Sequence, residues 1–223
     1  MSGPIIRPAR IGLAASLALL SLAGCAKNRG ELVVDDSVGV TALRSPCPIV
    51  AIPEMTGDIT LLAPGRTDAG AIDTVAAITN LRSTCNDAAK ADQLVTRVTF
   101  DVIARRTDSH GARHLELPYF SAVQRGGATL VAKQQGIIRI DFADGQDRAS
   151  ASASAQAQVS RAEATLPAAI RARLARKRKA GDTDAAVDPL SLPEVKAALT
   201  KATFEVLIGF QLTEPQLAYN ATR

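Results

Sequence analysis

The chain of 223 residues has no tryptophan, two tyrosines and five phenylalanines. Platforms that bind sugars or nucleotides usually stack their ligand on aromatic rings, so this scarcity argues against such a platform. Histidine is equally rare, and both histidines, His110 and His114, flank the turn-like sequence GAR. On a turn, a separation of four residues does not place two rings on one face as it does on a helix, so the pair makes a poor metal site.

Motifs for common chemistries are absent as well. The sequence contains no GxxxxGK[ST], GxSxG, HExxH or GxGxxG pattern, which are the motifs of phosphate loops, α/β-hydrolases, zinc proteases and dinucleotide folds. Its 26 basic and 22 acidic residues give a net charge of only +4, which does not support a nucleic-acid partner. We therefore expect no catalytic activity, no cofactor, no metal ion and no bound nucleic acid.

The N-terminus contains a targeting signal. Arg7 and Arg10 are the only charges before an uncharged run of 14 residues, Ile11 to Gly24. A helix needs about 20 apolar residues to span a bilayer. A basic start followed by a shorter apolar core is typical of a signal peptide.

The end of that signal, Leu22-Ala23-Gly24-Cys25, resembles the lipobox of bacterial lipoproteins at all four positions. The resemblance implies that Cys25 receives a diacylglyceryl group, that residues 1–24 are removed, and that the new amino terminus is acylated. Ala26, in place of aspartate, implies sorting to the outer membrane, facing the periplasm. The alternative is that Cys25 ends an apolar helix that is never cut.

Two cysteines remain, Cys47 and Cys85. In an oxidising envelope compartment an even pair predicts a disulfide, which here closes a loop of 38 residues. Such a loop should stabilise the fold by roughly 3 to 4 kcal/mol. A metal or redox site is the alternative, but the sequence has no CxxC pair and both histidines lie elsewhere.

Hydrophobic periodicity of two predicts an all-β fold. Leu94 to Ala104, Ile138 to Phe142 and Phe204 to Leu212 alternate apolar with polar residues, and every phenylalanine lies in a run of this kind, which predicts that all five fill the core. Further strands are expected at 59–62, 73–85, 115–124 and 130–133, with a hairpin turn at the QRGGAT sequence, residues 124–129. About seven strands without helix–strand alternation favour an immunoglobulin-like β-sandwich.

The domain organisation follows from these segments. We expect a signal peptide at 1–24, a lipidated N-terminus and tether at 25–46, and a β-sandwich at 47–223 with a basic, helical insertion at 165–201. The VV and VGV pieces of the tether could instead add a strand. Residues 148–164 alternate alanine with serine or glutamine, which indicates an edge strand or, alternatively, a low-complexity loop.

The insertion contains the most unusual local feature of the chain. Pro167 and Gly181 are placed to begin and end a helix, and Ser191 with Glu194 has the capping-box spacing for a second helix over 192–201. The first helix carries six positive charges within nine residues: Arg171, Arg173, Arg176, Lys177, Arg178 and Lys179. Such a cluster could contact anionic lipid or an acidic envelope partner. The alternative is a solvated insertion, because the apolar stripe is narrow.

The sequence thus predicts a lipid-anchored cell-envelope protein with a structural, scaffolding or binding role. The segments IGFQLTEPQLAYN and LPYF also resemble parts of small uncharacterised lipoproteins of Gram-negative bacteria, a resemblance that implies no activity. Two alternatives remain. One is a carrier with an apolar cavity for a lipid or glycan between the sheets, and the other is an envelope hydrolase with an unrecognised site.

Overall fold

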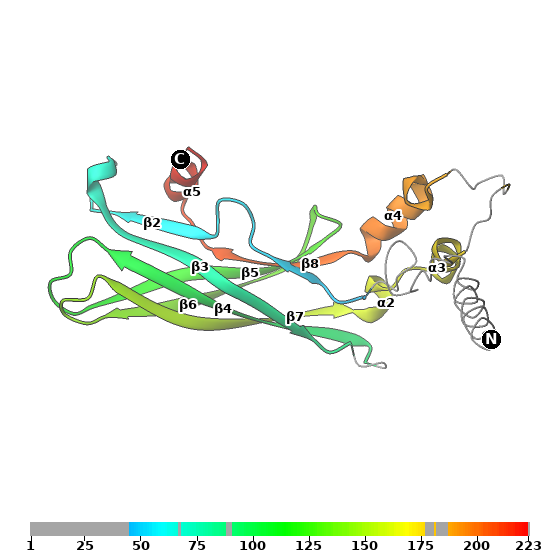
Figure 1. Cartoon of the computed structure of the whole chain (residues 1–223), viewed down its shortest axis with the longest axis horizontal. Coiled ribbons are helices and arrows are strands. Elements are labelled where there is room, and N and C mark those ends of the chain that lie inside the picture. Colours follow the sequence, from blue (N-terminus) through cyan, green and yellow to red (C-terminus); the bar gives the residue numbers. More distant parts are fainter. Residues whose placement is uncertain (1–44, 67, 88–90, 177–180, 182–186, 223) are drawn as a thin grey trace, which may run out of the picture. The chain divides into compact units, whose positions relative to one another are not determined.

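The structure is a computed structural model that describes residues 45–222, except for 67, 88–90, 177–180 and 182–186. It contains two four-stranded sheets (Figure 1). The first sheet has the order β1 (Ile49–Ala51), β8 (Phe204–Phe210), β5 (Arg113–Arg125) and β6 (Thr129–Phe142). The second has the order β2 (Asp58–Leu62), β3 (Ile72–Cys85), β4 (Gln93–Arg106) and β7 (Arg148–Ser160). The predicted all-β sandwich is confirmed.

Helices are short and lie outside the sheets. A 3-10 turn, η1 (Ala69–Ala71), precedes β3. The connection from β7 to β8 holds α2 (Arg161–Ala164), α3 (Ala168–Ala175), η2 (Pro189–Ser191) and α4 (Pro193–Ala202), as expected of a helical insertion before the last strand. Both predicted helices of the insertion are therefore present, but the predicted end of the first at Gly181 is wrong: α3 ends at Ala175, and its C-cap Arg176 is extended.

The core lies between the sheets because the predicted alternation holds. On β4 the even-numbered residues from Leu94 to Arg106 are buried, and on β8 the even-numbered residues from Phe204 to Phe210 are buried. Four of the five phenylalanines belong to this core. Phe120 is the exception: it lies on the other face of β5, where the Lys133 ammonium sits 5.0 Å from its ring centroid. The prediction that all five phenylalanines fill the core is wrong at that position.

Turns and caps agree with the sequence only in part. Gly126 and Gly127 both have positive φ and form the predicted β5–β6 hairpin turn. The predicted capping box is wrong: Leu192 is the N-cap of α4 and makes no side-chain cap hydrogen bond, while the Ser191 hydroxyl donates to the Asp188 carbonyl. A real capping box, Thr213 with Gln216, begins α5 (Glu214–Ala221) instead.

The side of the sandwich that contains β1 and β2 is closed by the chain itself, and we call it the closed side. Residues 52–57 pass from the first sheet to the second, and their backbone accepts hydrogen bonds from Phe210 of β8 and Ile78 of β3, each 2.8 Å long. Helix α5 packs against β2, and its buried Asn220 amide donates to the carbonyls of Met55 and Asp58. Chain, helix and sheets thus form one continuous wall.

The opposite side, which we call the open side, is bounded by the edge strands β6 and β7. One side chain bridges it: the Tyr119 hydroxyl of β5 donates to the Ser154 carbonyl of β7 over 3.3 Å. Tyr119 is paired in register with Gly136 of β6, and a Cβ at Gly136 would lie 2.4 Å from the tyrosine ring. Glycine is therefore required there, because the ring covers the β6 backbone.

Candidate functional site

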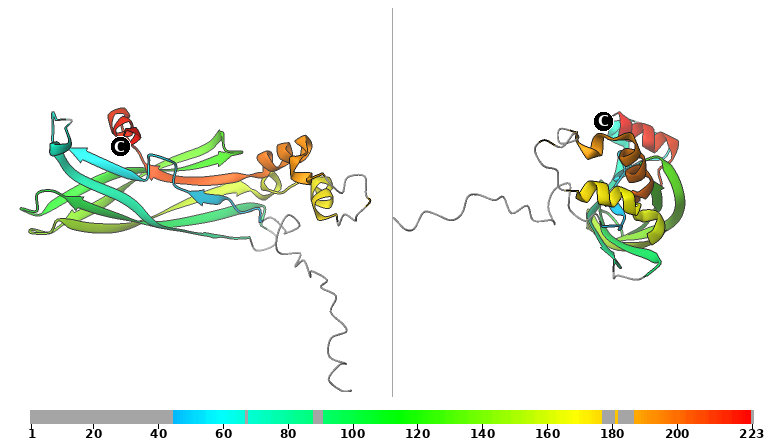
Figure 2. Two further views of the ribbon diagram at one scale, coloured as in Figure 1. Left: turned by 45° about the horizontal axis from the view of Figure 1, so that its top comes forward. Right: turned by 90° about the vertical axis from the view of Figure 1, so that its right-hand side faces the viewer.

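The helices of the insertion lie together at one end of the sandwich, beside the point where the described chain begins (Figures 1 and 2). We call this the helical end and define it by Ser45–Cys47, Cys85–Asp87 and Arg161–Arg176. The predicted disulfide is present there, with Cys47 and Cys85 joined at a Cα separation of 6.2 Å. Because Cys47 precedes β1 and Cys85 ends β3, the bond ties the start of the domain to the second sheet.

Arg161 organises the helical end. Its guanidinium donates to the carbonyl of Ala91 over 2.7 Å and forms an ion pair with Asp87 over 3.0 Å. The other oxygen of the Asp87 carboxylate accepts a hydrogen bond from Ser45. Asp87 thus links the start of the described chain to α2, so that start and the helical insertion are fixed to the same end.

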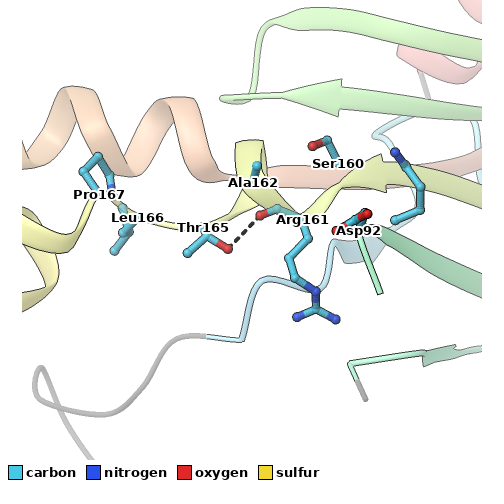
Figure 3. A pocket seen from close by; sticks show the side chains of 8 residues that line it. Asp92, Ser160, Arg161, Ala162, Thr165, Leu166 and Pro167 are labelled. Carbon is cyan, nitrogen blue, oxygen red and sulfur yellow. Dashed lines mark hydrogen bonds between the residues drawn. The ribbon is translucent and has the colours of Figure 1, made fainter. Parts of the chain in front are cut away.

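An open depression of about 650 Å³ lies beside Arg161 (Figure 3). It is lined by Asp92, Gln93, Ser160, Arg161, Ala162, Thr165, Leu166 and Pro167. The Thr165 hydroxyl already donates to the Arg161 carbonyl, and Arg161 is committed to Asp87 and to backbone carbonyls. These contacts build a support for α2, and neither histidine lies among the lining residues as a base for Ser160 or Thr165.

Helix α3 is the exposed element of this end. None of its residues is buried, and Arg171, Arg173 and Arg176 are exposed. Arg173 forms an ion pair with Glu194 of α4, which fixes α3 to the neighbouring helix. Lys177, Arg178 and Lys179, the other predicted members of the basic cluster, lie outside the described residues. Apart from the Arg173–Glu194 ion pair that holds it to α4, α3 contributes no buried side chain to the domain.

The remaining predicted site residues are elsewhere. Cys25 and the tether up to residue 44 lie outside the described residues, while Ser45 and Pro46 belong to the helical end. His110 and His114 lie at the opposite end of the sandwich, which we call the loop end, and each contacts its own aspartate: Asp108 and Asp141, both at 2.6 Å. The pKa of Asp108 is lowered, chiefly by hydrogen bonds from the His110 backbone and ring. The two histidines therefore form two separate pairs.

The loop end holds a buried residue that the sequence did not single out. Arg106 is 2% exposed, and its guanidinium donates to the carbonyls of Gln146, Ser109, Gly111 and Ala143 over 2.7 to 3.0 Å. It also lies 5.1 Å from the ring centroid of Phe142. An inward, even position on β4 was the available signal, because burial there demands hydrogen-bonded partners. Arg106 therefore joins the β4–β5 and β6–β7 loops.

Bidentate pairing also fixes Asp73 to Arg113 at the loop end. The two bonds are 2.8 and 2.6 Å long and join β3 of the second sheet to β5 of the first. The pKa of Asp73 is lowered, first of all by the hydrogen bonds from Arg113. This pair is a structural tie between the sheets, since both partners satisfy each other.

The alternatives to a binding role can be set against the same geometry. A second open depression, of about 640 Å³, lies on the outer face of the second sheet around Val75, Ala77 and Ile103; neither depression lies between the sheets, where a carrier would hold its ligand. Among the described residues, no three His, Cys, Asp or Glu side chains are grouped to hold a metal ion, and no helix is long and apolar enough to cross a bilayer.

Comparison with protein-family models, curated proteins and solved structures finds no match to this chain.

Proposed function

We propose that this chain is a lipid-anchored protein of the bacterial envelope, attached through Cys25 to the outer membrane, and that its domain binds or scaffolds without a catalytic role. The proposal rests on the lipobox and on the helical end. The observation that carries the binding role is α3: an exposed helix with no buried side chain, whose two arginines and C-cap Arg176 are exposed, held where the chain leads back toward Cys25.

Charge and distance make anionic headgroups the first contact to test. If residues 26–44 are flexible, they span on the order of 25 Å, so α3 can reach the surface to which Cys25 is attached. Each basic residue near an anionic surface contributes about 1 kcal/mol of attraction, which decreases within a Debye length. Three to six such residues would orient the domain with its helical end toward the membrane.

The test is hydrogen exchange in α3 on the full chain reconstituted into vesicles. We expect slower exchange at 168–176 in vesicles that contain phosphatidylglycerol than in phosphatidylcholine alone, and loss of the difference in high salt. Replacing Arg171, Arg173 and Arg176 by glutamine should abolish it. The matched control replaces Arg97, Arg105 and Arg148, which are exposed on the second sheet, and should leave it unchanged.

Two results would contradict the proposal at different points. Equal exchange in both vesicles would leave α3 as a solvated insertion and remove the headgroup contact. A Cys25→Ser chain that is still processed at the same site and still membrane-bound would remove the lipid anchor. Mass spectrometry of the N-terminal peptide gives the second answer directly, since acylation adds a defined mass to Cys25.

A further inference from the structure

Strand β7 is a long edge without the usual protection against pairing. It spans 13 residues, keeps continuous register with β4, and carries no charge or proline from Ala149 to Ser160. Within the part of the chain that the structure describes, no strand pairs with its outer edge. The other edges differ: β1 and β2 have three and five residues, and β6 carries Lys133, Arg139 and Asp141. Natural edges are normally kept short, charged or bulged to prevent pairing with another chain.

The direction of the free backbone groups follows from the bonds to β4. The Arg106 amide donates to the Asp147 carbonyl, and the Arg161 amide donates to the Asp92 carbonyl, just beyond the two ends of β7. In this register the odd-numbered residues of β7 bond to β4, so the even-numbered residues direct their N–H and C=O groups toward the free edge. The bond from Tyr119 to the Ser154 carbonyl agrees with this parity.

The core is only half covered along the same strand. The inward alanines at 149, 151, 153 and 155 are partly exposed, although the residues opposite Ala151 and Ala153 on β4, Val102 and Phe100, are buried. A strand added to β7 would place small side chains over these alanines and complete the wall that the closed side already has. Its inward residues must also be small, because the Tyr119 ring occupies the space behind the edge.

We propose that the occupant is β7 of a second copy of this chain, paired antiparallel about a two-fold axis at Ser154. Strand β7 itself has the small inward side chains that this position needs, since its inward residues around the centre are alanines. It also has the matching backbone groups: in this register the even-numbered residues, whose N–H and C=O groups face the free edge, pair with even-numbered residues of the second copy. This register overlaps Arg148 with Ser160 of the second copy, so the two Arg148 side chains lie at opposite ends of the paired strands. A parallel arrangement in register would put the two Arg148 side chains together, which is unfavourable.

Cysteine cross-linking tests the register on the full chain in detergent. At the axis, two Ser154→Cys residues would have Cα atoms about 5.5 Å apart, within the range that a disulfide bridges. Ser150→Cys is the matched control: it lies on the same face and is equally exposed, but its counterpart would lie roughly 27 Å away. We expect oxidation to give a covalent dimer for Ser154→Cys and at least roughly tenfold less for Ser150→Cys. Equal cross-linking at both positions would overturn the register.

Sedimentation of the same full chain tests the dimer itself. We expect the native chain to sediment as a dimer and Ser154→Lys, which places two like charges at the axis, to sediment as a monomer. Thr99→Lys is the control, because Thr99 is the β4 neighbour of Ser154 on the same outer face and should leave the dimer intact. A native chain that is monomeric would overturn the proposal, as would capture of another protein's strand at this edge by a monomeric chain. The outcome does not depend on lipidation of Cys25.

Discussion

The closed side and the open side of this sandwich are held together by different kinds of contact. The closed side has a disulfide, a chain crossing between the sheets and a helix anchored by Asn220. The open side has one tyrosine in its middle and, at the loop end, the β6–β7 loop held by Arg106. The two sides of a sandwich therefore need not be equally cross-linked. Because the disulfide and backbone hydrogen bonds hold the closed side together, the edge strands of the open side are left available to pair with another strand.

The largest predicted effect concerns the single strong tie of the open side. Replacing Arg106 by methionine keeps an apolar stem but removes all four guanidinium hydrogen bonds; the Ser109 and Ala143 carbonyls still accept from the amides of Gly145 and Gln146, whereas those of Gln146 and Gly111 lose this donor. We expect a loss of roughly 3 to 5 kcal/mol in the free energy of unfolding, since each hydrogen bond made by a charged group such as the buried guanidinium contributes about 1.5 to 3 kcal/mol. Chemical denaturation measures the loss. Arg105→Met, at the exposed neighbouring position, is the control, and an equal loss there would contradict the role of Arg106.

Breaking the closed side should cost nearly as much. Replacing Cys47 and Cys85 together by serine removes the cross-link without leaving a reactive thiol. We expect a loss of about 3 to 4 kcal/mol, because the unfolded chain regains the entropy of a loop of that length. Denaturation of the oxidised native chain and of the double variant gives the difference. Hydrogen exchange should increase mainly in β1 and in the second half of β3, and an increase confined to β6 and β7 would contradict this assignment.

A smaller effect is expected where Tyr119 bridges the open side. Gly136→Val places a side chain where the ring lies, so the tyrosine must leave the β6 backbone and its bond to Ser154. Strain of this kind typically costs about 1 to 3 kcal/mol. Denaturation gives the energy, and faster amide exchange around Ser154 reports the lost bridge. Ala132→Val, at an exposed position on the same face of β6, should be close to neutral; a similar loss there would indicate a general effect on the strand.

The smallest effect is the pH dependence of stability that comes from the Asp73–Arg113 ion pair, which joins the two sheets. The pKa of Asp73 is lowered in the folded state, so its pairing stabilises the fold fully above the ordinary value of about 3.9 and progressively less as the pH falls through the lower, folded value. We expect the native chain to lose more stability between pH 7 and about pH 3 than Asp73→Asn does. Denaturation at both values tests this, and identical pH profiles would exclude a contribution from the pair.

Local patterns in the sequence predicted much of the fold. Alternation in Leu94 to Ala104 and Phe204 to Phe210 identified core strands, and Gly126-Gly127 identified a hairpin, because a period of two and positive φ are properties of neighbouring residues. The C-terminal helix was missed although Thr213, Pro215 and Gln216 carry a capping-box signal. Phe120 was misplaced because the alternation of β5 does not show which face meets the opposite sheet.

The candidate site was predictable in composition but not in position. The basic cluster at 171–179 is visible in the sequence, and so is the pairing of Cys47 with Cys85, since only two cysteines remain after the lipobox. That both lie at the same end depends on contacts over long separations, such as Arg161 with Asp87. No local pattern encodes such contacts, because they form only once the sheets have packed.

By itself the sequence determined an all-β chain with a disulfide pair and a helical insertion, because each depends on local residue patterns; the lipobox stays a prediction. The edge strand expected at 148–164 is confirmed as β7. Only the tertiary structure decided the other edges, the outward direction of the even-numbered backbone groups of β7, and the burial of Arg106 at the loop end. The physical reason is that the position of a strand, at an edge or in the middle, depends on strand order. Strand order is set by contacts between residues far apart in the sequence, such as Cys47 with Cys85, which are 38 residues apart. An alternating alanine and serine strand has the same local pattern in the middle of a sheet as at its margin.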